Sequence, residues 1–125
     1  MPKSYSVLYV EDDEDIAQEM AFFLQSRVKT LYTAYDGDEG LALFKKQSPD
    51  IVITDIKMPH RDGLSMAEAI LEISPNTPII VLSAFNDATY LFKAIELGVY
   101  KYLPKPSNLK NLLQTLEDIA VKKKA

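Results

Sequence analysis

Strand patterns alternate with helix patterns five times along this chain, and that alternation restricts the possible folds more than any other feature. Runs of β-branched and aromatic residues predict strands at 5–10, 28–34, 51–55, 79–83 and 100–103. Apolar residues at helical spacing predict the intervening helices, at about 13–26, 37–47, 64–71, 88–97 and 109–120. Because right-handed helical crossovers join successive parallel strands, the sequence predicts an α/β fold. This fold is a doubly wound (βα)5 unit, with helices on both faces of a five-stranded parallel sheet.

The same patterns predict which helical side chains face the core. The expected stripes are Ile16, Met20, Phe23 and Leu24; Leu41 and Phe44; Leu64, Ala67, Ile70 and Leu71; and Leu109, Leu112, Leu113, Leu116, Ile119 and Ala120. A length of 125 residues, 47% of them hydrophobic, suffices for one sizeable core but not for two. We therefore expect residues 1–125 to form a single domain.

Composition excludes several kinds of protein. The chain has no cysteine, so disulfides and thiolate metal sites are excluded, and a reducing cytoplasm is the expected compartment. It shows neither a signal peptide nor a membrane-spanning run, so we expect no membrane insertion. A net charge of −4 argues against direct nucleic-acid binding. The basic cluster at 122–124 is expected to be a solvated helix end.

The central predicted strand ends in a carboxylate. The run Ile51–Asp55 is typical of a strand buried on both faces, and Asp55 stands at its carboxyl end. In open parallel sheets this edge is where ligands bind. Other predicted strands bring Glu11, Asp12, Ser83 and Lys105 to the same edge. We therefore expect three carboxylates, a hydroxyl and an amine to converge on one crevice.

Three neighbouring carboxylates need a compensating charge. Two carboxylates about 5 Å apart repel by roughly 3 kcal/mol at an effective dielectric of about 20. A hard divalent cation with oxygen ligands, Mg²⁺ or Mn²⁺, relieves that repulsion and is normally completed by phosphate oxygens. Glu11 and Asp12 precede the first helix and are the better ligands. Residues 13–15 are expected instead to stabilise the N-terminus of that helix.

Four motifs stand in register along the chain. They are Val10-Glu11-Asp12-Asp13-Glu14; Asp55-Ile56-Lys57-Met58-Pro59 with Asp62-Gly63; Leu82-Ser83-Ala84; and Tyr102-Leu103-Pro104-Lys105-Pro106. Together they resemble the response-regulator receiver domain of two-component signalling, of the chemotaxis-regulator kind, over essentially the whole chain. The resemblance implies a flavodoxin-like fold. It also implies a signalling protein rather than an enzyme, one that catalyses only its own phosphorylation and dephosphorylation.

The resemblance implies a role for each residue of the crevice. Asp55 is the nucleophile that takes a phosphoryl group from the phosphohistidine of a sensor histidine kinase or phosphotransfer protein. Glu11 and Asp12 hold the metal ion together with Asp55 and the backbone carbonyl of Lys57. Lys105 pairs with a phosphoryl oxygen.

The resemblance also implies an output surface, formed by the helix at 88–97, the strand at 100–103 and the helix from 109. Ser83, standing where threonine is more frequent, donates its hydroxyl to the phosphoryl group and forms a switch pair with Tyr102. The surface is implied to bind a downstream partner or output domain, or a second copy of the chain. Tyr90, Leu97 and Tyr100 are expected either to extend this surface as exposed groups or to be partly buried.

Three other functions could be considered for such a crevice, and the sequence argues against two of them. A haloacid-dehalogenase-type phosphatase needs an Asp-x-Asp pair, whereas Lys57 stands two residues after Asp55. A flavodoxin-like flavin binder needs a loop rich in Ser, Thr or Gly after the first strand, whereas this loop is acidic. The remaining alternative is a pseudo-receiver, which keeps the fold as a protein-interaction module and is never phosphorylated.

Overall fold

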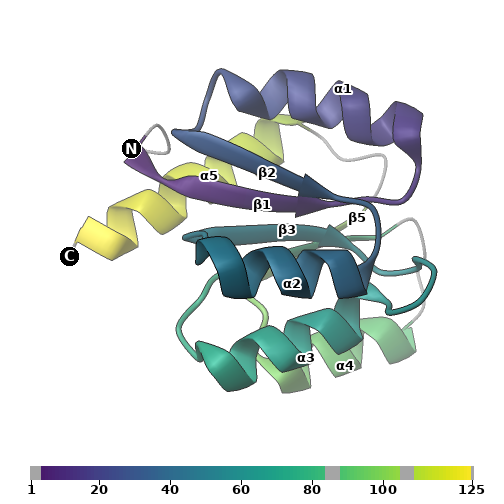
Figure 1. Ribbon diagram of the computed structural model, residues 1–125. Coiled ribbons are helices and arrows are strands. Elements are labelled where there is room, and N and C mark those ends of the chain that lie inside the picture. The colour runs from purple at the N-terminus through teal and green to yellow at the C-terminus, as the bar shows by residue number, and fades with distance from the viewer. Residues whose placement is uncertain (1–3, 84–87, 105–108, 125) are drawn as a thin grey trace.

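The computed structural model describes residues 4–83, 88–104 and 109–124. Five strands and five helices alternate along the described residues (Figure 1). The strands are β1 (Ser6–Val10), β2 (Thr30–Ala34), β3 (Ile51–Asp55), β4 (Ile79–Ser83) and β5 (Lys101–Pro104). The helices are α1 (Glu14–Gln25), α2 (Gly37–Gln47), α3 (Gly63–Ile73), α4 (Ala88–Leu97) and α5 (Leu109–Lys124). The predicted alternation is confirmed, although β2 begins at Thr30 rather than at Val28.

The five strands form one parallel sheet in the order β2-β1-β3-β4-β5. β1, β3 and β4 lie inside the sheet, and nearly all of their side chains are buried. Since neighbouring residues of a strand point to opposite faces, these strands supply apolar side chains to both sides. The sheet confirms the predicted α/β doubly wound class.

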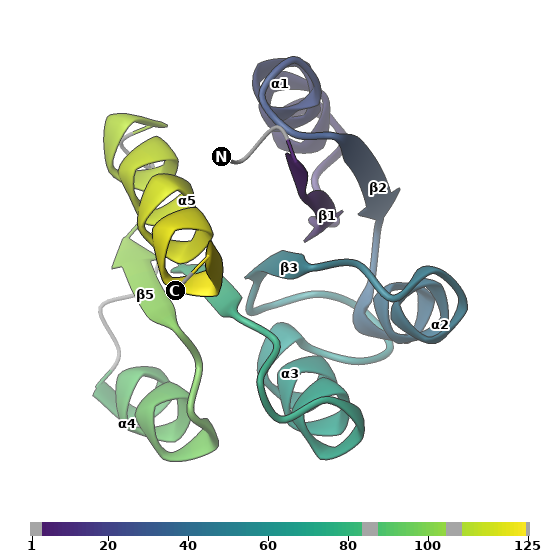
Figure 2. The same ribbon diagram turned by 90° about the vertical axis from the view of Figure 1, so that its left-hand side faces the viewer.

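Two helical layers enclose the sheet (Figure 2). α1 and α5 cover one face, where they pack on Val7, Tyr9, Ile51, Ile53, Ile80 and Leu82. α2, α3 and α4 cover the other face, where they pack on Leu8, Val10, Val52, Ile79 and Val81. No helix among the described residues is long and apolar enough to cross a membrane.

Aspartates begin three of the helices. Asp13, Asp36 and Asp62 each accept a hydrogen bond from the backbone N–H three residues later, at 3.1, 2.8 and 2.7 Å. Such N-caps pair an amide that the helix itself leaves unbonded. Glu14 and Asp15 follow Asp13 in the first turn of α1, so the acidic helix start predicted for residues 13–15 is confirmed.

The core differs from the predicted stripes in its helical phase. In α1 the buried residues are Ala17, Met20 and Leu24, whereas Ile16 is 40% exposed. Met20 and Leu24 are buried as predicted, and Ala17 takes the place expected for Ile16 on the face toward the sheet. Leu109, expected in the core, is likewise 40% exposed at the start of α5. Other predicted core residues, Phe23, Leu41, Leu71 and Leu113, are only partly buried.

The backbone conformation of Ser48 can be tested by mutation. It ends α2 in the left-handed conformation, with φ of 47°, and its side chain is exposed. Glycine adopts this conformation without a Cβ penalty, so Ser48→Gly is expected to raise the free energy of unfolding by about 0.5–1 kcal/mol. Urea denaturation measures the change.

Ser26→Gly is the matched control, because Ser26 ends α1 with an ordinary right-handed φ of −88°. There the added backbone freedom brings no relief, and the free energy of unfolding should fall by a few tenths of a kcal/mol or more. Equal shifts of the two variants would contradict the assignment of strain to Ser48.

Candidate functional site

An acidic cluster lies at the carboxyl edge of β1 and β3. One carboxylate oxygen from each of Glu11, Asp12 and Asp55 lies within 4.8 Å of the others. The strand register explains the convergence, because Val10 pairs with Thr54 and the next residue of each strand is an acid. Glu11 is 1% exposed, Asp55 is half-buried and Asp12 is exposed. The structure therefore brings together the three carboxylates predicted from the sequence, in a site open to solvent on one side.

Backbone amides orient two of these carboxylates. The N–H of Ile56 donates to Asp55 Oδ1 at 2.7 Å, and the N–H of Asp13 donates to Glu11 Oε2 at 3.3 Å. The backbone of Glu11 is itself fixed, since its N–H donates to the carbonyl of Ala34 at 3.0 Å. Main-chain contacts thus help to fix the positions of these two acids.

Gly63 sets the backbone around Asp55. Its N–H donates to the carbonyl of Ile56 at 2.7 Å, which closes the β3–α3 loop. A Cβ at this position would lie 1.8 Å from the carbonyl oxygen of Asp55, so no other residue fits. The sequence motif included Gly63, but the close approach that requires glycine is evident only in the structure.

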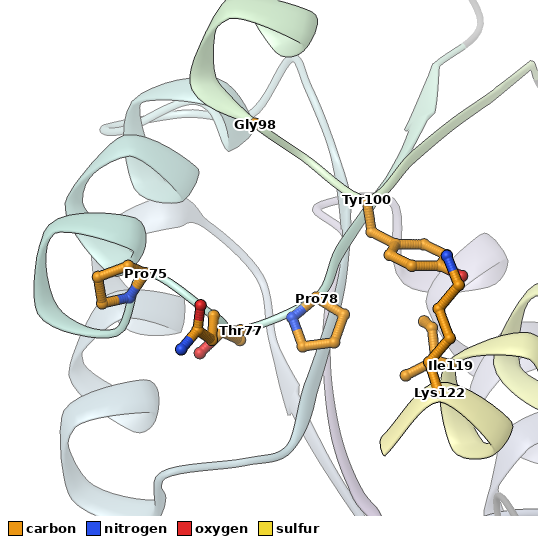
Figure 3. A pocket seen from close by; sticks show the side chains of 8 residues that line it. Pro75, Thr77, Pro78, Gly98, Tyr100, Ile119 and Lys122 are labelled. Atoms are coloured by element: carbon orange, nitrogen blue, oxygen red, sulfur yellow. The ribbon is translucent and has the colours of Figure 1, made fainter. Parts of the chain in front are cut away.

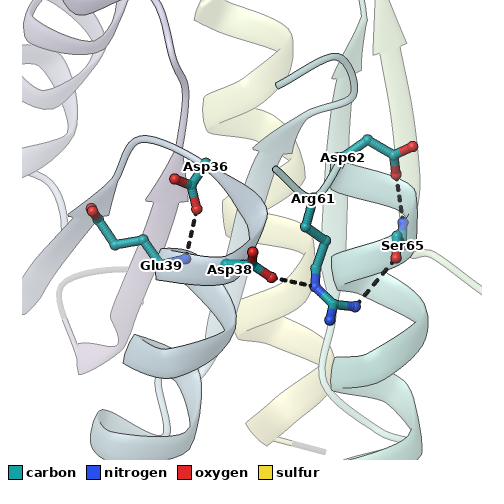
Figure 4. A network of polar contacts seen from close by, with 6 residues as sticks. All are labelled: Asp36, Asp38, Glu39, Arg61, Asp62 and Ser65. Carbon is teal, nitrogen blue, oxygen red and sulfur yellow. Dashed lines mark hydrogen bonds and ion pairs between the residues drawn. The ribbon is translucent and has the colours of Figure 1, made fainter. Parts of the chain in front are cut away.

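A polar network ties the same loop to the start of α2 (Figure 4). Arg61 Nε lies 2.8 Å from Asp38 Oδ1, and Arg61 Nη1 donates to Ser65 Oγ at 3.3 Å. The carbonyl of Arg61 accepts the N–H of Gly37 at 2.9 Å. A Cβ on Gly37 would lie 2.3 Å from that carbonyl oxygen. The sequence pattern does not reveal the role of Arg61, because its partners at the start of α2, Gly37 and Asp38, are distant in the chain.

Ser83 and Tyr102 lie on the same face of the sheet. Val81 pairs with Tyr102, and Ser83 follows Val81 by two residues, so both side chains face α3 and α4. Ser83 is 1% exposed and Tyr102 is partly buried. Lys57 is exposed in the β3–α3 loop, while Lys105, the predicted amine of the crevice, lies outside the described residues.

The exposed apolar side chains of α4 are not those that the sequence predicted as possible members of the output surface. Tyr90, Leu97 and Tyr100 are partly buried, which is one of the two expected outcomes. The exposed groups are instead Leu91, Phe92 and Ile95, at 37, 63 and 63%. Ile95 stands four residues after Leu91 and three after Phe92, so the three side chains lie on one side of the helix. Only Ala94 is buried among the residues of α4, so most of this helix is open to contact.

A separate cavity of about 350 Å³ lies at the opposite edge of the sheet (Figure 3). Its wall includes Pro75, Thr77, Pro78 and Tyr100, and Lys122 Nζ stands 5.1 Å from the centre of the Tyr100 ring. No carboxylate belongs to this wall among the described residues. The cavity lies at the N-terminal ends of β4 and β5, whereas the acidic cluster lies at the C-terminal ends of β1 and β3. The two sites are therefore separate.

The acidic cluster has the chemistry of a site for a hard divalent cation. Its three groups supply oxygen ligands only, and the exposed side leaves room for water or phosphate oxygens. Mg²⁺ is characteristically held by one or two carboxylates while keeping several waters. The donor set therefore fits Mg²⁺ or Mn²⁺ better than Zn²⁺, which prefers nitrogen and sulfur ligands.

Comparison with known proteins agrees with this geometry. The family model described as the response regulator receiver domain matches residues 7–117. The chain is 34% identical over 118 residues to the uncharacterized transcriptional regulatory protein YesN of Bacillus subtilis, covering 92% of this chain but 32% of that protein. It is 33% identical to the chemotaxis protein CheY of Treponema pallidum, covering 92% of this chain and 82% of CheY. The chain thus spans about a third of the first relative.

A solved structure shows the same fold. The N-terminal domain of an uncharacterized protein from Wolinella succinogenes superimposes with a TM-score of 0.91 at 40% sequence identity. The match covers 96% of this chain and 97% of that one. The arrangement of strands and helices is therefore shared along nearly the whole chain.

Removal of one charge from the cluster is expected to stabilise the metal-free protein. In chelator, Asp12→Asn should raise the free energy of unfolding by about 1 kcal/mol, since it relieves repulsion that the exposure of Asp12 already weakens. Added Mg²⁺ should stabilise the wild type more than the variant, through mass action. Thermal unfolding with and without Mg²⁺ measures both effects.

Asp15→Asn removes the same charge from the first turn of α1 and serves as control. It should lower stability slightly, because that carboxylate favours the helix N-terminus, and it should leave the response to Mg²⁺ unchanged. Identical behaviour of the two variants would show that repulsion within the cluster is not the cause.

Proposed function

This chain belongs to the response regulator receiver family of two-component systems, and from that premise we propose that Asp55 is the phosphoryl acceptor of a signalling switch. The observation that carries the proposal is the convergence of Glu11, Asp12 and Asp55 at one sheet edge. The donor is a phosphohistidine of a sensor histidine kinase or phosphotransfer protein. We also propose that residues 1–125 act as one domain in the cytoplasm, where the histidine of such kinases is phosphorylated.

The proposed step is phosphoryl transfer onto a carboxylate. An oxygen of Asp55 attacks the phosphorus, the bond from phosphorus to the imidazole nitrogen breaks, and an aspartyl phosphate forms. The bond from the Ile56 N–H to Oδ1 holds the carboxylate in one orientation for this attack. Because the chain itself receives the group, it acts as a signalling module and not as a turnover enzyme.

Five further groups are proposed to assist the transfer. Glu11 and Asp12, with Asp55 and the carbonyl of Lys57, hold Mg²⁺ or Mn²⁺, which when bound screens the charge between Asp55 and the phosphoryl oxygens. Lys105 pairs with a phosphoryl oxygen, on the basis of its place in the sequence motif. Ser83, buried at the end of β4, donates its hydroxyl to another oxygen.

The phosphorylated state is proposed to be read at the surface formed by α4, β5 and α5. Ser83 and Tyr102 share one sheet face, so movement of the Ser83 hydroxyl toward Asp55 opens space into which Tyr102 can turn. Exposed Leu91, Phe92 and Ile95 supply apolar area on α4 for a downstream partner, an output domain or a second copy of the chain. The domain binds no nucleic acid directly in this proposal.

Incubation with a small phosphodonor and Mg²⁺, followed by intact-mass measurement, tests phosphorylation. We expect one added phosphoryl group on the wild type, which chelator prevents. Asp55→Asn should remain unmodified, whereas Asp118→Asn, on α5 and outside the acidic cluster, should be modified like the wild type. A wild type that takes no phosphoryl group from any donor would instead support the pseudo-receiver, a pure interaction module.

Beryllofluoride, a mimic of the phosphoryl group, tests transmission to the output surface. Added with Mg²⁺, it should shift amide NMR signals near Asp55 and also those from Tyr90 to Tyr102. In Ser83→Ala the shifts near Asp55 should persist while the remote ones shrink, because the hydroxyl that couples the two sites is gone. Remote shifts that survive Ser83→Ala would refute the switch pair, and shifts confined to the acidic cluster would refute transmission itself.

A further inference from the structure

Tyr9 combines full burial with an unmatched polar group. It is the next-to-last residue of β1, and the residue is 1% exposed. Its hydroxyl oxygen is buried and finds no hydrogen-bond partner among the residues that the structure describes. Buried polar atoms of folded proteins nearly always have a partner, so a lone one requires an explanation. Phenylalanine would fill the same space without that cost, and the hydroxyl therefore points to a state in which a partner is present.

The strand register places this hydroxyl beside the acidic cluster. Tyr9 and Glu11 are two residues apart on β1, so both side chains leave the same face of the sheet. Tyr9 pairs with Ile53, and Asp55 follows Ile53 by two residues on the neighbouring strand. Tyr9 thus leaves the sheet on the same face as Glu11 and Asp55, one side-chain position before each along its strand, and α1 and α5 cover that face.

The electrostatic environment agrees with that placement. Burial raises the pKa of the Tyr9 phenol far above its ordinary value, and the negative charges of Glu11, Asp55 and Asp13 raise it further. These charges act on the phenol because they are close to it. Any phenol is neutral near pH 7, so the Tyr9 hydroxyl carries a proton that it can donate to a carboxylate oxygen.

We propose that Tyr9 is a positioning residue of the metal site, whose hydroxyl donates to the Glu11 carboxylate, directly or across one water molecule, when that carboxylate holds the cation. The inference rests on the proposed function, since it assumes that Glu11, Asp12 and Asp55 bind Mg²⁺. Hydrogen bonds from outside the ligand shell fix the orientation of ligating groups, and their loss typically weakens metal binding by about 10–100-fold. Glu11 needs such support because it reaches the site from a buried position.

Tyr9→Phe removes the hydroxyl alone, and calorimetric titration with Mg²⁺ measures the result. We expect the variant to bind Mg²⁺ about 10-fold more weakly than the wild type. Tyr100→Phe is the matched control, because it makes the same change beside the cavity at the opposite edge of the sheet. It should bind Mg²⁺ like the wild type. Equal affinities of all three proteins would overturn the proposal.

Thermal unfolding in chelator separates positioning from a structural role. Because the hydroxyl has no described partner, Tyr9→Phe should unfold at the same temperature as the wild type or at a higher one. A clearly lower temperature would show that the hydroxyl already makes a stabilising bond without metal, and would overturn the proposal. A wild type that binds no Mg²⁺ would overturn the proposed function as well, whereas a wild type that binds while Tyr9→Phe binds equally well overturns only the role of Tyr9.

Discussion

Burial of the parallel sheet on both faces is the constraint on which the rest of the structure depends. β1, β3 and β4 carry apolar side chains into two separate cores, so charged groups cannot be placed along these strands without losing hydration. The acids appear where the strands leave the cores. Glu11 and Asp55 are therefore brought side by side by the strand register itself, and the cluster is a consequence of how the sheet ends.

Close approach of the main chain turns this edge into a defined site. The loop after β3 is held by Gly63, where no Cβ fits, and by the contact between Gly37 and the carbonyl of Arg61. The ion pair of Arg61 with Asp38 is exposed, so its net contribution to stability is small, on the order of 0–1 kcal/mol. This ion pair matters more for position than for stability, because it links the loop beside Asp55 to the start of α2.

The acidic edge of the sheet borders both cores, and different residues connect it to each core. Toward α1 and α5 the neighbour is Tyr9, which is fully buried. Toward α3 and α4 the neighbour is Ser83 at the end of β4, which shares its sheet face with Tyr102. Repulsion between like charges in one site lowers the local stability of the fold. A cation that neutralises these charges relieves the repulsion, and its binding is stronger for that reason.

The amino-acid sequence by itself determined the fold class and the three acids of the site. Periodicity and position at a strand end are local properties, so Ile51–Asp55 and Glu11 were recognisable without a structure. Only the tertiary structure decided the phase of α1, the requirement for glycine at position 63, the contacts of Arg61 and the unmatched hydroxyl of Tyr9. Each of these depends on contacts between residues that are not neighbours in the chain, and such contacts are fixed by the packing of the folded domain.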